Sequence, residues 1–156
     1  MRRVIYLLLS TAEFSHITFE NSNDTLFFHM EDSIASVDHM FCENVHTLIS
    51  DYESLAIYSE NVSLSLTNSE FINLSGGTEG GAVFCETFLD GVNFDKNYIL
   101  IENCTFEEVT STENGGAVQI KNIEAVIENS VFEYCETEGI GGAIYFNCDD
   151  VVFGEY

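Results

Sequence analysis

Short alternations of apolar and polar residues follow one another along the chain. Between residues 116 and 132 the apolar positions are Val118, Ile120, Ala125, Ile127 and Phe132. An alternation with a period of two is typical of short β-strands. The alternation changes parity near Asn122 and again near Asn129. We expect the chain to bend at both places, because asparagine tolerates a left-handed backbone conformation better than most residues.

One phrase recurs three times with the same internal spacing. Asn is followed by Phe three residues later and by Gly-Gly-Ala from twelve residues later. The copies are residues 68–85, 103–120 and 129–146, and their phenylalanines are Phe71, Phe106 and Phe132. Such a repeat predicts a solenoid in which each copy forms one coil. Because the β-branched and aromatic bias favours strands, and period-3.6 stretches are missing, the coils are expected to be all-β.

Two weaker copies precede the three strong ones. Residues 14–19 read FSHITF, with His16 in the Asn position. Residues 36–41 read SVDHMF, with Asp38 in that position and Phe41 as the phenylalanine. We therefore predict a parallel β-solenoid of about five to six coils.

Stacked coils place equivalent residues in columns along the solenoid. The Gly-Gly pair is expected to let the chain turn sharply where backbones pass closely. Three predicted columns are Cys85, Ile120 and Phe146; Leu74, Val109 and Cys135; and Ser69, Cys104 and Ser130. Cysteines that share columns with Leu, Val, Ile or Ser are interpreted as buried reduced thiols. Cys42 is aligned with Ile72, Glu107 and Glu133, which predicts an exposed side chain.

The whole chain, residues 1–156, is interpreted as one β-solenoid domain. Nine extra residues at 88–96 are read as a loop insertion. Val4 to Leu9 is read as a strand, because this apolar run is shorter than the core of a signal peptide. The last copy stops before another Asn-x-x-Phe phrase, and the sequence shows no capping helix. We therefore expect a segment of a longer solenoid that self-associates end to end or along its edges.

The charge balance narrows the classes of partner. Asp and Glu number 27 against four Lys and Arg, giving a formal net charge of -23. The cations are Arg2, Arg3, Lys96 and Lys121. Such a surface repels nucleic acid, and we expect no nucleic-acid partner. No apolar run reaches the ~20 residues of a membrane-spanning helix.

The phrases NSEF, NCTF and NSVF, each followed by GGAV or GGAI, resemble the repeats of the polymorphic outer-membrane-protein family. This family is marked by Gly-Gly-Ala-Ile and Phe-x-x-Asn motifs. The resemblance implies a right-handed parallel β-helix of the pectin-lyase-like superfamily. It also implies an extracellular or cell-surface location and an adhesin-like role, with proteins or glycans as partners. Only residues 41–44, Phe-Cys-Glu-Asn, match Phe-x-x-Asn strictly.

Many pectin-lyase-like proteins cleave polysaccharides, so we consider whether this chain is an enzyme. Relatives of this kind use a basic residue as proton acceptor, and Lys96 and Lys121 are the only cations after Arg3. The adjacent carboxylates Asp149 and Asp150 are interpreted as a solvated turn rather than an acid–base pair. We predict no catalytic residues and no cofactor. A degenerate or partial carbohydrate-active β-helix is the first alternative.

Two groups of residues invite a metal interpretation. His39, Cys42 and His46 lie close in sequence, yet their spacing fits no standard zinc pattern; the other histidines are His16 and His29. Five glutamates occupy equivalent regions of successive coils: Glu107, Glu108, Glu133, Glu136 and Glu138. Calcium favours several oxygen ligands, so a calcium-linked binding module is the second alternative. We predict no metal site, and interpret these acids as a charged surface that opposes edge aggregation.

Four Asn-x-Ser/Thr sequons could carry glycans in a secreted protein. They begin at Asn23, Asn61, Asn73 and Asn103. Asn103 is also a repeat asparagine, so its sequon is interpreted as structural in origin. Taken together, the sequence favours a non-catalytic structural or interaction module.

Overall fold

The computed structural model describes residues 2–23, 25–47, 54–88 and 97–147. These residues form fifteen strands and no helix, and therefore no helix suited to crossing a membrane. The strands of the first two coils are β1 (Arg2–Leu8), β2 (Thr11–Asn23), β3 (Thr25–Glu31) and β4 (Ile34–His46). The next two coils contain β5 (Ile57–Glu60), β6 (Ser63–Thr67), β7 (Glu70–Glu79), β8 (Val83–Glu86), β9 (Tyr98–Glu102) and β10 (Thr105–Asn114). The last strands are β11 (Val118–Lys121), β12 (Glu124–Glu128), β13 (Val131–Glu133), β14 (Glu136–Thr137) and β15 (Ile144–Asn147).

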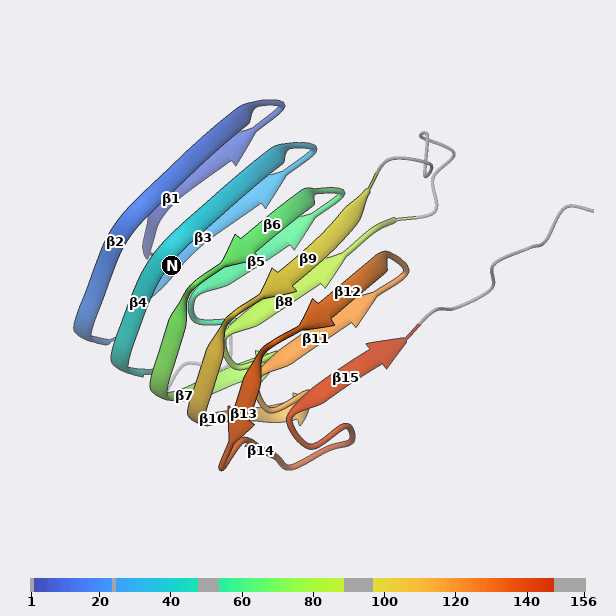
Figure 1. Ribbon diagram of the computed structural model, residues 1–156. Coiled ribbons are helices and arrows are strands. Elements are labelled where there is room, and N and C mark those ends of the chain that lie inside the picture. The colour runs from blue at the N-terminus through green and yellow to red at the C-terminus, as the bar shows by residue number, and fades with distance from the viewer. Residues whose placement is uncertain (1, 24, 48–53, 89–96, 148–156) are drawn as a thin grey trace, which may run out of the picture.

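The strands stack into two parallel sheets that face each other across the core (Figure 1). The six-stranded sheet has the order β1-β3-β5-β8-β11-β15. The other sheet has nine strands: β2 and β4 in the first two coils, and in the later coils β6 and β7, β9 and β10, and β12, β13 and β14. The described residues thus make five coils and the first strand of a sixth. The predicted all-β parallel solenoid is confirmed.

The strand register confirms the predicted columns of the strong repeats. Phe71, Phe106 and Phe132 are direct partners on β7, β10 and β13. Their rings stack with centroids 4.9 and 4.7 Å apart inside the solenoid. Each additional coil therefore buries its phenylalanine against the one before it, which is why a single coil could not be stable alone.

The cysteine interpretation holds for the described thiols of the strong repeats. Cys85 and Cys104 are buried and free, and Cys135 is half-buried near the last coil. Burial raises the pKa of the Cys85 thiol to about 12 and that of Cys104 to about 11. These thiols are therefore neutral packing groups at physiological pH.

Each coil bends at residues that adopt a left-handed backbone. The first bend forms a column of His16, His39, Asn68, Asn103 and Asn129, with φ between 50° and 55°. A second column contains Asn21, Asn44, Asn73, Glu108 and Tyr134, and a third contains Leu9, Asp32, Asn61 and Asn122. The bends predicted at Asn122 and Asn129 are confirmed. Asparagine and histidine tolerate this conformation better than most side chains.

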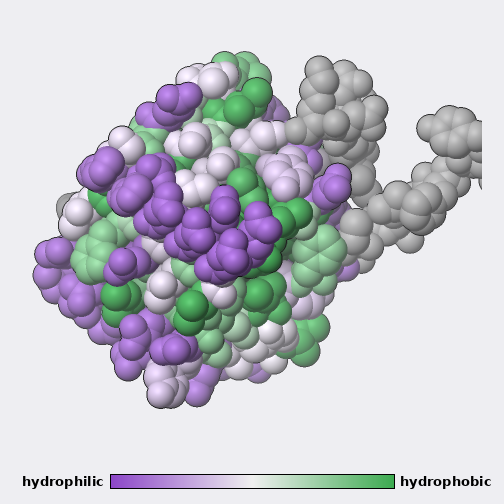
Figure 2. All heavy atoms as spheres, in the orientation of Figure 1, coloured by the Kyte–Doolittle hydropathy of each residue, from purple (hydrophilic) through white to green (hydrophobic). Residues whose placement is uncertain are grey.

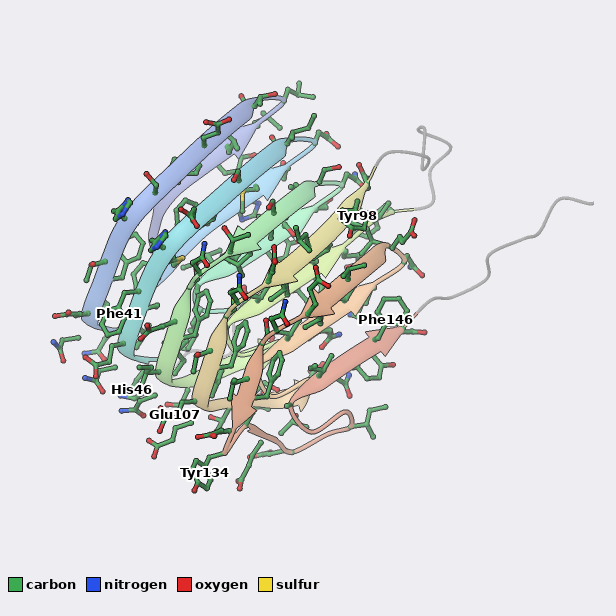
Figure 3. All side chains as sticks on the ribbon, viewed as in Figure 1. Phe41, His46, Tyr98, Glu107, Tyr134 and Phe146 are labelled. Atoms are coloured by element: carbon green, nitrogen blue, oxygen red, sulfur yellow. The ribbon has the colours of Figure 1, made fainter. Side chains whose placement is uncertain are left out.

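The prediction for residues 36–41 is wrong by one position. His39, not Asp38, occupies the bend, and the residue aligned with Phe71 is Cys42, not Phe41. Cys42 is consequently buried in the core rather than exposed. Phe41 is half-exposed on the outside of β4, in register with Glu70 (Figure 3). The small thiol fits the column because it lies between the rings of Phe19 and Phe71.

The repeated glycines stand where backbones of adjacent coils nearly touch. Gly81 donates its N–H to the Gly116 carbonyl, and Gly116 donates to Gly142. A Cβ at Gly81 would overlap the Gly116 carbonyl oxygen, and one at Gly116 would lie 2.5 Å from the Glu136 carbonyl oxygen. Close approach thus explains the Gly-Gly pair, as expected from the sequence.

Two further predictions concern the ends and the insertion. Val4 to Leu8 lie in a strand, β1, which forms the edge of the six-stranded sheet, and Leu9 is at the bend that follows it. The side chains of Leu8 and Leu9 are exposed. The loop insertion predicted at 88–96 lies almost wholly outside the described residues.

Replacing Phe106 by Ala should lower the free energy of unfolding by about 3–5 kcal/mol, because it removes a fully buried ring from a continuous stack. Replacing the neighbouring Glu107, which points outward, should change stability by less than about 0.5 kcal/mol. Urea unfolding of both variants measures the difference. Equal effects would mean that the inward column is misassigned.

Candidate functional site

The outer side of the six-stranded sheet carries two rows of side chains along the stack. Residues of this sheet alternate, so every second side chain points away from the core. The first row is Tyr6, His29, Tyr58, Phe84, Gln119 and Tyr145. The second row is Leu8, Glu31, Glu60, Glu86, Lys121 and Asn147. Among the described residues, those best suited to catalysis or ligand binding lie on this face.

The first row contains a stack of rings in which Tyr6 is 48% exposed and the next three rings are closed to solvent. Ring centroids lie 5.1 Å apart for Tyr6 and His29, 4.6 Å for His29 and Tyr58, and 5.3 Å for Tyr58 and Phe84. His29 is only 6% exposed, Tyr58 8% and Phe84 1%. A platform for sugar stacking needs open ring faces, and these rings do not offer them.

The carboxylates of the second row bind the polar atoms of the first. Glu31 accepts a hydrogen bond from the Tyr6 hydroxyl at 2.9 Å, and its other oxygen lies 2.6 Å from Nε2 of His29. Glu60 accepts from the Tyr58 hydroxyl at 3.0 Å. These acids therefore orient the rings of the stack.

Lys121 is the one cation whose side chain is placed in the part of the chain that the structure describes. Its Nζ lies 2.5 Å from Oε2 of Glu79 and 5.0 Å from the centre of the Phe84 ring. Gln119, which is fully buried, donates to the same Glu79 oxygen at 3.2 Å. Lys121 is therefore engaged by a carboxylate and a ring of the protein itself. Lys96, the other cation considered, lies outside the described residues.

Glu86 is the titratable group of this face whose surroundings most disfavour its charged form. Burial raises its pKa; Lys121 opposes this effect, and Glu79 and Glu60 add to it. Two buried atoms nearby, Nδ1 of His29 and Oε1 of Gln119, have no hydrogen-bond partner in the described structure.

The histidines form a different arrangement from the one considered in the sequence. Cys42 points into the core, His39 lies at the first bend, and His46 is half-buried beside Ser75 (Figure 3). These three residues do not converge. Instead, the rings of His16 and His39 stack in parallel with centroids 4.8 Å apart.

Asp38 holds the His39 ring at this bend. Its Oδ2 lies 2.7 Å from Nδ1 of His39, while Oδ1 accepts hydrogen bonds from Asn68 and Thr67, each at 2.7 Å. The hydrogen bond from Asn68, followed by those from Thr67 and His39, lowers the pKa of Asp38 well below its usual range. The carboxylate is thus an acceptor, so Nδ1 of His39 carries its proton.

The acidic residues of the later coils are spread along the surface. Glu107 and Glu133 are in register, whereas Glu108 is at the second bend beside Tyr134, and Glu136 pairs with Thr110. In residues 2–23, 25–47, 54–88 and 97–147, no group of three or more His, Cys, Asp or Glu side chains is arranged to hold a metal ion. Hydrophilic residues cover much of the face seen in Figure 2, with apolar residues between them.

Three of the four sequons lie at bends. The Asn61 amide donates to Asp32, and the Asn73 amide donates to Asn44 at 2.7 Å. Asn103 is exposed at the first bend, and Asn23 is exposed at the end of β2. Asp149 and Asp150 lie outside the described residues.

Comparison of the chain with protein-family models, curated proteins and solved structures gave no significant match. The sequence did not reveal the outer rows of the six-stranded sheet or the stacked histidine pair. Both arise only when the register brings together residues of unlike type from different coils.

Replacing Glu86 by Gln should raise the midpoint of thermal unfolding at pH 7. A carboxyl whose pKa is raised by folding holds a proton that the unfolded chain loses, so its contribution to stability falls as pH rises above the usual carboxyl pKa. Glutamine cannot ionise, so the gain should vanish below that pKa, where Glu86 is protonated in both states. Glu128→Gln, at an exposed position, is the control. A loss of stability at pH 7 would show that attraction to Lys121 outweighs burial.

Proposed function

We propose that the chain is a non-catalytic structural and interaction module, a β-helical segment of a surface or adhesin-like protein. One observation carries the proposal: the side chains best suited to catalysis or ligand binding are bonded to, or packed against, one another. The rings of His29, Tyr58 and Phe84 on the outer side of the six-stranded sheet are buried, and Lys121 is held in an ion pair. What remains for partners is the outer surface of a long acidic solenoid.

The glycine columns support the resemblance to polymorphic outer-membrane-protein repeats. Gly81, Gly116 and Gly142 pack backbone against backbone at equivalent points of three coils. We propose on this basis a relation to the pectin-lyase-like superfamily and an extracellular or cell-surface location, with proteins or glycans as partners.

Partly exposed strands at the two ends of the described coils support the proposed self-association. At the first coil, β1 and β2 each have one partner strand, and Phe14, Ile17 and Phe19 are only half-buried. At the other end of the described coils, Val131 and Phe146 are 46% and 53% exposed. Figure 3 shows Phe146 on β15. Such edges favour pairing with another chain, which light scattering would measure. The net charge opposes that pairing, most strongly at low salt.

A carbohydrate-active protein is the second candidate. The observation in its favour is that Lys121, Glu79 and Glu86 lie together on the outside of a parallel sheet. A calcium-linked module rests on the register of carboxylates such as Glu107 and Glu133. Among the described residues, the glutamates do not bring three metal ligands together. Lys121, the candidate base, is held in an ion pair.

Incubation with pectate, polygalacturonate and neutral glycans, with and without Ca²⁺, should give no depolymerisation. Product formation is measured by reducing ends and by absorbance of unsaturated sugars. Lys121→Met is the matched variant, because it removes the described cation of this face. Turnover by the unmodified chain that disappears in this variant would establish the carbohydrate-active alternative instead.

A further inference from the structure

The bend that follows β1 carries a leucine where later coils carry polar residues. Leu9 adopts a left-handed backbone with φ of 47°, in the bend column that continues with Asp32, Asn61 and Asn122. A bulky apolar residue is an outlier in this conformation, whereas asparagine and aspartate accept it more readily. Leu9 is also 76% exposed. The packing of the described coils explains neither feature, and such an outlier points to a role in binding.

Leu8, Leu9 and Ile34 form what we call the apolar corner of the first two coils. Leu8 is 45% exposed and stands in the row in which the next coil has Glu31. Ile34 is 59% exposed, and its N–H donates to the carbonyl of Ser10, the residue after Leu9. Three exposed apolar residues therefore stand together where the later coils have acids and amides. Contiguous exposed apolar residues of this kind are typical of a contact surface.

Among the described coils, the first alone has balanced charges. Residues 2–23 contain two Arg and two Glu, whereas residues 25–47 contain four acids and no Lys or Arg. At the other end, residues 118–147 contain five Glu and one Lys. Two chains that each carry a net charge of -23 repel each other least where the facing coils are neutral. The distribution of charge therefore favours contact between two first coils over contact that involves the last coil.

The strands of the first coil are suited to pairing with a second copy. β1 and β2 lie at one end of the stack, and each pairs with one strand among the described residues (Figure 1). A second copy related by a two-fold axis places its own first coil against this end with antiparallel strands, a pairing that backbone hydrogen bonds accommodate. The first coil, residues 2–23, is close in length to the ~20–30 residues that each partner contributes to a stable interface.

We propose that the first coil is a dimer interface, in which the apolar corner of each copy packs against the first coil of the other. This inference rests on the proposed interaction module and names its partner as a second copy of the same chain. Because both copies use the same surface, the contact is isologous and closes at two chains. Phe14 and Phe19, which are half-buried on β2, gain cover from the second copy.

Sedimentation velocity of the full chain over a range of concentrations tests the interface. The unmodified chain should form dimers and nothing larger, and NaCl should not dissociate them, because the contact is apolar and its charges balance. Leu9→Asn should weaken dimerisation at least tenfold, and asparagine occupies the same bend at Asn61 and Asn122. Ile34→Ser, which copies Ser63 at the position in register, should also weaken it. Urea unfolding at concentrations at which all chains are monomeric should show that neither variant loses stability.

Ile140→Asn is the control, because Ile140 is 60% exposed near the last described coil, away from the apolar corner. It should leave dimerisation unchanged. A monomer at every concentration, a dimer that both corner variants leave intact, or growth into longer assemblies would overturn the proposal. A monomer that binds phosphatidylcholine vesicles through Leu9 would also overturn it, because lipid would then be the partner. Cleavage of glycans, assayed separately, would instead overturn the non-catalytic function and leave the measured dimer as it stands.

Discussion

The structure depends on the in-register hydrogen bonding of each coil to the next. Parallel strands with matched register place the same backbone conformation, and a side chain of similar size, at every level of the stack. The Phe71, Phe106 and Phe132 rings pack inside because their strands are in register, and the glycines allow close passage because their backbones are in register. A slip by one residue would turn each strand inside out, since successive side chains point to opposite faces.

The strand register also decides which side chains lie in the core and which lie on the surface. Apolar columns point inward and leave acids such as Glu107 and Glu133 on the outside, where like charges stand in adjacent coils. On the six-stranded sheet the same register stacks Tyr58 on His29 and allows Glu31 and Glu60 to form hydrogen bonds with side chains of the neighbouring row. On this sheet, several polar side chains of neighbouring coils are therefore bonded to one another, which is the basis of the proposed structural role.

The sequence predicted the strong repeats well because their residues recur in kind. Asn129 bends the chain, Phe106 fills the core and Gly116 passes close to its neighbour, and each has a counterpart of the same type in other coils. Residues 36–41 were misaligned because Phe41 resembles the phenylalanine of the strong repeats, whereas the residue in register with Phe71 is Cys42. The position of the second bend was not predicted, because Asn73, Glu108 and Tyr134 share a backbone conformation but no side-chain chemistry. The outer row of His29, Tyr58, Phe84 and Gln119 and the His16–His39 pair depend on register between coils, which composition and spacing do not define.

The register itself can be measured by disulfide formation between neighbouring coils. Parallel partners lie about 4.8 Å apart, within the range that a disulfide spans. Replacing both Glu107 and Glu133, which are direct partners on the outer surface, by Cys should give an intramolecular disulfide under mild oxidation. The pair Glu107 and Glu136, in which Glu136 is the partner of Thr110, should not form one. Efficient bonding in the second pair but not in the first would contradict the stacking on which the account rests.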